Sequence, residues 1–407
     1  MRIAVCCAAV TAALVPLTAW AQPAALTESE ALARLSAESP RVRAIRAAIE
    51  IARAEVLAAG RPPNPRLIFD RESVAGTTEY LTRIGQVLPI TGYRGLQADA
   101  ASALVDAATS RADEEVRRAR ADLRTAFTQL VAAQAREREL TAARERLQGV
   151  ADVLVKREAA GDAAGFDRLR AEREVLDLEA DRAAAAADRL RAQAALAGFF
   201  SGPIDPATLV AAAGAPPSAA LPEVDALLER AESARGELQA LRKEIESAEI
   251  SARAADRRRI PEPDLVAGTK SSSLGGGDLG SVFGVQATLP LFDRGQPERA
   301  LSQARASQAQ ARIEVFRLAL RAEIAGWRAA VIERRAAAER YRATALGSAD
   351  QIERIAQVSY DAGERGILEL LDAFRTRSTA RVRQAALDAS VREAEIELEF
   401  VSGWEIR

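Results

Sequence analysis

Residues 261–265 read Pro-Glu-Pro-Asp-Leu, and residues 63–67 read Pro-Asn-Pro-Arg-Leu. Both stretches are followed by a strand-like region, a long helical region and a turn with glycine, at Gly161 in one copy and Gly363 in the other. A shorter helical region then returns. Duplication within one chain is typical of pseudo-symmetric stacking or of a ring of subunits. The sequence therefore predicts a mainly α fold with a small β part, built from two copies of a helix–hairpin–long helix–short helix unit.

The boundaries of these copies follow from prolines, glycines and changes of period. The first repeat is expected at 22–198, with a hairpin at about 65–89, a long helix at about 96–160 and a returning helix at about 167–197. The second repeat is expected at 222–407, with a hairpin at about 263–290, a long helix at about 298–362 and a returning helix at about 367–401. Residues 199–221 form a linker rich in alanine, proline and glycine. Before the first hairpin, Thr27 and Glu30 form a capping box that predicts one helix from there to Gly60.

The second hairpin has the clearer strand pattern. Leu279, Phe283 and Val285 share one face with small residues, and the residues between them lie on the other face. A strand of roughly 9–11 residues with one apolar face fits a transmembrane β-strand. An ordinary surface hairpin of a soluble domain gives the same alternation, so both interpretations remain open at this point.

The long helical region of the second copy has a seven-residue recurrence of apolar positions. Ile324, Val331, Ala338, Ala345 and Ile352 are each seven residues apart. This spacing indicates coiled-coil packing against a neighbouring helix.

The N-terminus has the features of a secretory signal peptide over residues 1–21. Arg2 precedes an apolar run from Ile3 to Leu17, and Ala19-Trp20-Ala21 fits a cleavage site. Gln22 follows the expected cut, so no lipid anchor on a cysteine is predicted. The only two cysteines, at positions 6 and 7, and the only methionine lie in this segment, and the chain has no histidine.

The composition of the remaining chain excludes several function classes. Without histidine and cysteine, disulfide scaffolding and Ser-His-Asp or Cys-His catalysis are excluded, and the usual ligands of zinc, copper and iron are absent. Removing Arg2 from the 56 basic residues leaves 55 against 58 acidic ones, a net charge of −3 that gives no support for nucleic-acid binding. We expect no cofactor, no bound metal and no enzymatic activity.

Two further stretches carry a family resemblance. Residues 289–296 read Leu-Pro-Leu-Phe-Asp-Arg-Gly-Gln, and residues 360–373 read Tyr-Asp-Ala-Gly-Glu-Arg-Gly-Ile-Leu-Glu-Leu-Leu-Asp-Ala. The first resembles the strand-to-helix junction of the TolC-type outer-membrane efflux channels (the outer membrane factor family), and the second resembles their helical-tip signature. With the signal peptide and the duplication, the resemblance covers almost the whole mature chain.

The resemblance implies a trimeric channel in the outer membrane of a Gram-negative bacterium, with a long periplasmic extension. Three protomers would share a 12-stranded transmembrane β-barrel and a periplasmic α-helical barrel. The partners would be a periplasmic adaptor protein and an inner-membrane pump, of the resistance-nodulation-division type, in contact with outer-membrane lipid. A closed barrel is consistent with elementary physics, because an open sheet edge in lipid leaves backbone groups without hydrogen bonds.

The resemblance also assigns roles to individual residues. Tyr360 and Arg365 fall at positions that restrain the closed end of the tunnel, and Asp167, on the equivalent turn of the first copy, is the expected partner of Arg365. Glu369 and Asp372 fall at the acidic ring of the pore constriction, although the family usually has aspartate at the first of these. The adaptor is expected to contact the two tips, at Gly161, Asp162, Gly363 and Glu364. The small residues of the first tip depart from the family's larger apolar ones.

The junction at 88–96, Leu-Pro-Ile-Thr-Gly-Tyr-Arg-Gly-Leu, is most similar to family members that work with heavy-metal exporters. This similarity implies efflux of metal cations. A channel need not chelate its cargo, so the lack of histidine, cysteine and methionine implies that the pump selects the metal.

Two other function classes remain possible. A secreted or periplasmic coiled-coil scaffold without a pore would explain the helices but not the paired hairpins. A carboxylate-dependent enzyme would need a nucleophile–base pair, a phosphate loop or a metal cluster, and none of these has a sequence signal.

Overall fold

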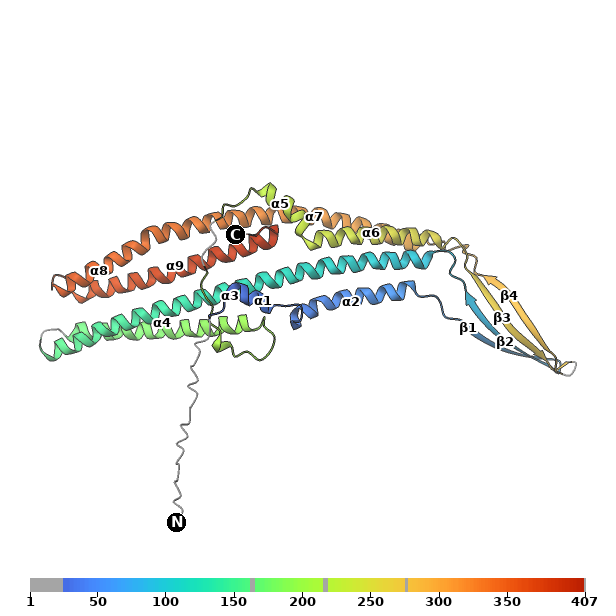
Figure 1. The fold of residues 1–407 in the computed structure, drawn as a ribbon, viewed down its shortest axis with the longest axis horizontal. Coiled ribbons are helices and arrows are strands. Elements are labelled where there is room, and N and C mark those ends of the chain that lie inside the picture. Colours follow the sequence, from blue (N-terminus) through green and yellow to red (C-terminus); the bar gives the residue numbers. More distant parts are fainter. Residues whose placement is uncertain (1–24, 162–164, 215–218, 275–276, 406–407) are drawn as a thin grey trace, which may run out of the picture.

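The computed structural model describes residues 25–161, 165–214, 219–274 and 277–405. The predicted signal peptide lies outside this part of the chain. Figure 1 shows an elongated molecule with a small sheet at one end and long helices running away from it. Long helices of both halves of the chain end together at the opposite end (Figure 1).

The elements follow one another in the same order in both halves of the chain. The first half consists of α1 (Glu28–Arg34), α2 (Pro40–Gly60), β1 (Arg66–Val74), β2 (Thr77–Val87), α3 (Tyr93–Ala159) and α4 (Gly165–Ala197). The second half consists of α5 (Val224–Ala234), α6 (Gly236–Arg257), β3 (Pro263–Ser272), β4 (Leu279–Ala287), α7 (Gln296–Tyr341), α8 (Gly347–Asp361) and α9 (Ile367–Ser402). A short 3₁₀ turn, Pro206–Thr208, lies in the linker between the halves.

The N-terminal capping box is confirmed, but the single helix predicted from Thr27 to Gly60 is wrong. The Thr27 side chain accepts a hydrogen bond from the Glu30 amide at 3.2 Å, and the Glu30 carboxylate accepts one from the Thr27 amide at 2.9 Å. The helix then ends at Arg34, and α2 starts afresh at Pro40 with Ser39 as its N-cap. Proline lacks the N–H that a helix interior needs and is accommodated only in the first turn, so it forces this break.

The long helix predicted over about 298–362 extends from Gln296 to Asp361, with one irregularity inside it. Between α7 and α8 the backbone forms a π-turn, Arg342–Leu346, with hydrogen bonds one residue longer than in an α-helix. The corresponding helix of the first half, α3, is continuous from Tyr93 to Ala159. The two halves therefore differ at this one point of their long helices.

The four strands form one antiparallel sheet in the order β1-β2-β3-β4. A two-residue loop, Ala75-Gly76, joins β1 to β2, and both residues have positive φ, at 50° and 79°. This conformation matches the right-handed twist of a hairpin and favours glycine. The pairing of Ile84 with Leu67 on one side and Ala267 on the other fixes which residues share a face.

The two faces of the sheet have opposite character. Six large apolar side chains on one face are each more than half exposed: Leu67, Phe69, Ile84, Leu279, Phe283 and Val285. The opposite face carries cross-strand ion pairs, between Arg83 and Asp70 at 2.5 Å, between Lys270 and Glu79 at 2.6 Å, and between Arg66 and Asp264. An exposed apolar face of this size on a sheet indicates a surface that contacts a membrane or another protein.

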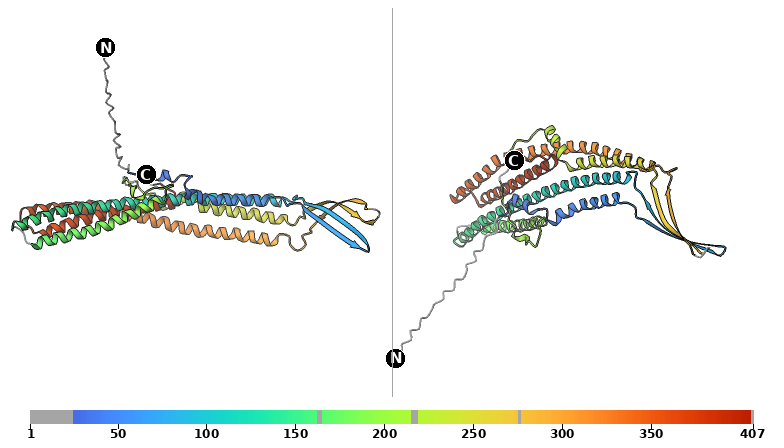
Figure 2. Two further views of the ribbon diagram at one scale, coloured as in Figure 1. Left: turned by 90° about the horizontal axis from the view of Figure 1, so that it is seen from below. Right: turned by 45° about the vertical axis from the view of Figure 1, so that its right-hand side comes forward.

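The helices lie side by side in a curved layer (Figures 1 and 2). Near the strands the order is α2–α3–α6–α7, and in the far half it is α4–α3–α9–α8. The helix α3 runs through both halves, and the shorter α2 and α4 follow each other along it (Figure 1). None of the helices in the described ranges contains a stretch long and apolar enough to cross a lipid bilayer.

One glycine lies where the backbones of two helices approach too closely to leave room for a side chain. Gly295 precedes α7 with φ of 86°, and a Cβ there would lie 2.1 Å from the carbonyl oxygen of Ala255 at the end of α6. Gly295→Ala is therefore expected to destabilise the fold by at least about 2 kcal/mol, because the left-handed conformation and the clash both oppose a side chain. Thermal melting followed by circular dichroism measures this loss. As a control, Gly326→Ala inside α7, where a Cβ meets nothing within 4 Å, should stabilise by about 1 kcal/mol. Equal melting of the two variants would contradict the prediction.

Candidate functional site

The residues predicted for the tips that the structure describes follow the ends of α3 and α8. Gly161 follows α3 with φ of 82°, and Gly363 follows α8 with φ of 76°. Glu364 is exposed in the second turn, where its amide donates to the Ser359 carbonyl at 2.9 Å. Asp162, the remaining predicted tip residue, lies outside the described residues. Figure 1 places the end of α3 and the end of α8 at the same end of the layer.

An apolar cluster behind the turns packs the two helical hairpins against each other. We call it the tip cluster; its buried members are Leu147, Ala151, Leu154, Ala171, Val175, Ala356, Ile367, Leu370, Leu371 and Ala373. They come from α3, α4, α8 and α9. The cluster holds the start of α9 in a defined orientation, which decides where the neighbouring polar residues point.

Tyr360 lies at the boundary between the two hairpins. It is half-buried against the tip cluster, and the guanidinium of Arg157 on α3 lies over its ring at 5.6 Å from the centroid. A cation over an aromatic face is attracted by about 0.5–1 kcal/mol at an exposed site. Tyr360 thus joins the α8–α9 hairpin to α3, which is consistent with a restraining position.

The predicted pair of Arg365 and Asp167 is not formed within the single chain. Arg365 is exposed just before α9, and Asp167 lies in the first turn of α4. No ion pair joins them within the described part of the chain, where the nearby Arg168 instead pairs with Glu158 and Glu172. Their pairing stays a prediction that concerns the assembled protein.

Glu369 and Asp372 are both exposed on α9, three residues apart. Leu370 and Leu371 between them are buried in the tip cluster, so the two carboxylates face away from it together. Glu369 lies in the first helical turn, where the helix dipole favours negative charge. The structure therefore presents two adjacent acidic groups to the solvent at one side of the tip.

Sequence reasoning missed a group of ion pairs that fixes α8 on α9. We call it the α8 clamp: Asp350 and Glu353 on α8, Arg377 and Arg381 on α9, and Arg146 on α3. Arg377 Nε lies 2.6 Å from both Asp350 Oδ1 and Glu353 Oε2, Arg381 donates to Asp350 at 3.1 Å, and Arg146 lies 3.9 Å from Glu353. Burial raises the pKa of Glu353 above its usual value, while the nearby Arg146 opposes the shift. In the sequence, the clamp is visible only as two acidic residues three positions apart and two arginines four positions apart. Such spacing is common on helices and does not identify a contact.

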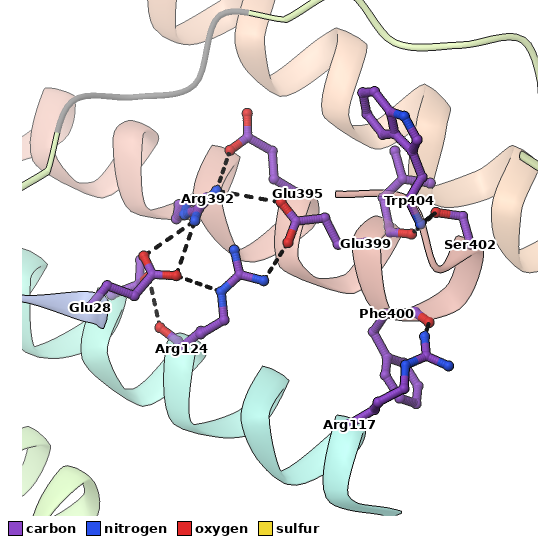
Figure 3. A network of polar contacts seen from close by, with 11 residues as sticks. Glu28, Arg117, Arg124, Arg392, Glu395, Glu399, Phe400, Ser402 and Trp404 are labelled. Atoms are coloured by element: carbon purple, nitrogen blue, oxygen red, sulfur yellow. Dashed lines mark hydrogen bonds and ion pairs between the residues drawn. The ribbon is translucent and has the colours of Figure 1, made fainter. Parts of the chain in front are cut away.

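A second network lies beside α1, near the middle of the molecule (Figure 1), and its contacts are seen from close by in Figure 3. We call it the equatorial network: Glu28, Arg124, Arg335, Arg392, Glu395 and Glu399. Glu28 on α1 accepts from Arg124 on α3 at 2.5 Å and from Arg392 on α9 at 3.1 Å. Glu395, only 1% exposed, accepts from Arg335 on α7 at 2.8 Å and from Arg392 at 3.3 Å. The network therefore joins helices of both halves with α1.

The described residues contain no group of three or more histidine, cysteine, aspartate or glutamate side chains placed to hold a metal ion. The described residues expected to act in the pore are charged or aromatic groups near one end of the molecule. Such an arrangement can favour or exclude ions by charge, and it can restrain helices, without making or breaking bonds.

The chain is similar to known proteins in its sequence. Residues 227–403 match the family model described as "Outer membrane efflux protein". The cobalt-zinc-cadmium resistance protein CzcC of Cupriavidus metallidurans is 25% identical over 344 residues, which cover 84% of this chain and 81% of that protein.

Solved structures share the fold along almost the full length. A membrane protein from Pseudomonas aeruginosa has a TM-score of 0.76 at 20% identity, over 92% of this chain and 93% of that one. The open state of the Neisseria gonorrhoeae MtrE outer membrane channel has a TM-score of 0.74 at 18% identity, over 93% and 89%. CusC, described as forming a transmembrane channel, has a TM-score of 0.73 at 15% identity, over 92% and 91%. The chain is thus similar to outer membrane efflux proteins over residues 227–403 and to CzcC over most of its length, and it shares its fold with solved outer-membrane channels.

Proposed function

We propose that this protein is the outer-membrane channel of a tripartite efflux system and gives substrates an exit duct across the periplasm. The observation that carries the proposal is the sheet with one exposed apolar face and one ion-paired polar face. An apolar face suits lipid, and a polar face suits a water-filled lumen. A scaffold without a pore would not need a sheet with one apolar face and one polar face.

Three copies complete the channel. In one chain β1 and β4 are the edges of the sheet, and unpaired edge groups cost several kcal/mol each in lipid. Pairing β4 of one copy with β1 of the next gives 12 strands in a closed barrel, as the family resemblance implies. The edge helices support the same arrangement, because Ile51 and Leu57 on α2 and Val315 and Leu318 on α7 are more than 60% exposed. A neighbouring copy would cover these side chains.

The partners of this channel are a periplasmic adaptor and an inner-membrane pump. The adaptor would contact the tips at Gly161, Asp162, Gly363 and Glu364. In this proposal residues 1–21 are the signal peptide, 22–198 and 222–407 are the two repeats, and 199–221 link them. The channel itself has no enzymatic role.

The cargo we propose is heavy-metal cations, delivered by a pump of the resistance-nodulation-division type. Its support is the likeness to a protein named for cobalt, zinc and cadmium resistance. Glu369 and Asp372 fit this cargo, because three copies of each exposed carboxylate around a narrow opening would raise the local concentration of cations.

The gate is tested by Arg365→Ser. Arg365 and Asp167 of the assembled protein would hold the tip closed together with Tyr360, so losing the guanidinium is expected to raise the resting single-channel conductance several-fold in a planar bilayer. Arg170→Ser, at an exposed arginine of α4, is the matched control and should leave the conductance unchanged. A purified protein that stays monomeric and passes no ions would overturn the channel itself, whereas an unchanged conductance of Arg365→Ser would overturn only this gate.

A further inference from the structure

The π-turn between α7 and α8 changes which residues of α8 face its neighbours. Up to the turn, the buried positions Ile324, Val331 and Ala338 follow the seven-residue spacing. Continued without change, this spacing would turn Ile352 inward. Instead Ile352 is 46% exposed, and the buried residues of α8 are Ala349 and Ala356.

The difference is one residue. A second line of positions seven apart starts at Trp327, which packs against the core, and would reach 348 and 355 in a regular helix. The structure buries 349 and 356, each one residue later, and leaves Ile355 51% exposed. A π-turn contains one extra residue, and each residue of an α-helix turns the chain by about 100°. The turn therefore rotates the whole of α8 relative to the spacing set by α7.

As a result, α8 has two possible apolar faces. In the register of this structure, two alanines are buried and two isoleucines are exposed. If the five residues Arg342–Leu346 became regular α-helix, Ile352 and Ile355 would turn inward and Ala349 and Ala356 outward. Isoleucine gains more from burial than alanine, but α8 is an edge helix of the layer, and in the assembled channel a neighbouring copy would cover its outer face, so burial alone selects neither register.

The α8 clamp selects the register of this structure. Asp350 and Glu353 reach Arg377 and Arg381 only because the π-turn brings them to the side of α9. The side chains of Arg377 and Glu353 are 18% and 15% exposed, so these pairs are partly shielded from water and from screening by salt. In the regular register the carboxylates would turn away, and the arginines would be left without them.

We propose that the π-turn is a hinge at which α8 turns between two registers, and that this rotation is part of opening the gate. The proposal rests on the channel function given above. Here the clamp holds α8 in the register of the resting state. At its far end α8 carries Tyr360, whose ring lies under Arg157, so a rotation would also break this contact at the tip.

The experiment uses cysteine accessibility, since both cysteines of the chain lie in residues 1–21. Ala349→Cys, at a position 3% exposed, should react slowly with a maleimide in the purified full-length protein. Breaking the clamp with Asp350→Asn and Glu353→Gln should raise this rate by about tenfold or more, because a minor register populated at 0.1–10% becomes a major one. Resting conductance in a planar bilayer should rise in the same variant.

Deleting Thr344 distinguishes a change of the register of α8 from a general loosening of its packing. A chain shorter by one residue can form a regular helix with positions 349 and 356 still inward, so the deletion removes the second register. In the clamp-broken Ala349→Cys background, the deletion should return both the labelling of the introduced thiol and the resting conductance to their original values. Thr344→Ala keeps the chain length and is the matched control, in which the raised labelling should persist.

Several outcomes would overturn the hinge. Labelling that does not change when the clamp is broken, or that stays high after the deletion, would show that α8 has no second register. Labelling that changes without any change of conductance would separate the rotation from the gate. Labelling is measured on the purified protein and does not depend on ion current. A sample that never conducts would therefore refute the channel function, while its labelling would still show whether α8 has a second register.

Discussion

Replacing Phe283 by arginine is expected to prevent the protein from reaching the outer membrane as an assembled channel. Phe283 lies in the middle of β4, and its side chain is 82% exposed on the apolar face of the sheet. An arginine facing lipid at the centre of a membrane strand costs about 2–4 kcal/mol, and a trimer would carry this cost three times. The total is comparable to the whole stability of an ordinary domain.

The loss is measured as heat-modifiable trimers in outer-membrane fractions on semi-denaturing gels. Gly284→Arg is the matched control, one residue further along the same strand. Its side chain would point to the polar face, and a Cβ there meets nothing within 4 Å. Normal amounts of trimer for Phe283→Arg, or equal losses for the two variants, would mean that the apolar face does not contact lipid.

The duplicated architecture could be predicted because its signals are local. Proline pairs, turn glycines and the alternation of β4 each depend on a few consecutive residues, and the capping box of Thr27 and Glu30 has the predicted hydrogen bonds. Two features of the helices were not predicted, for different reasons. Pro40 marks the break between α1 and α2 in the sequence itself, whereas the π-turn at Arg342–Leu346 contains ordinary helix-forming residues that do not mark it.

Of the candidate site, the sequence predicts only residues at the tip, and their roles stay predictions. The resemblance placed Tyr360, Glu369 and Asp372 on a motif of fixed spacing, and the structure puts them beside the tip cluster. The α8 clamp could not be found, because its pairing depends on the phase of α8, and the spacing before the π-turn predicts that phase wrongly. The equatorial network joins residues as far apart in the chain as Glu28 and Arg392, and no local pattern carries such a contact.

Replacing Glu395 by alanine is expected to destabilise the fold by about 3 kcal/mol. The Glu395 side chain is 1% exposed and accepts hydrogen bonds from Arg335 and Arg392, which connect α9 to α7 and, through Glu28, to α1. Removing one partner of a buried pair leaves a charge without compensation, which typically costs about 3–5 kcal/mol. The lower end of this energy range applies here, because the two arginine side chains are about a quarter exposed. When the carboxylate is removed, they regain part of their hydration.

The melting temperature followed by circular dichroism measures this loss, and two further variants test its cause. Glu397→Ala, two residues away on α9, removes a pair with Arg118 in which both side chains are more exposed, so it should cost about 1 kcal/mol or less. The double variant Glu395→Leu with Arg335→Leu removes both charges and should recover most of the stability, because apolar replacements of a buried pair are often neutral. If the double variant were as unstable as Glu395→Ala, lost packing rather than an uncompensated charge would be the cause. Equal losses for Glu395→Ala and Glu397→Ala would show that burial does not strengthen the equatorial network.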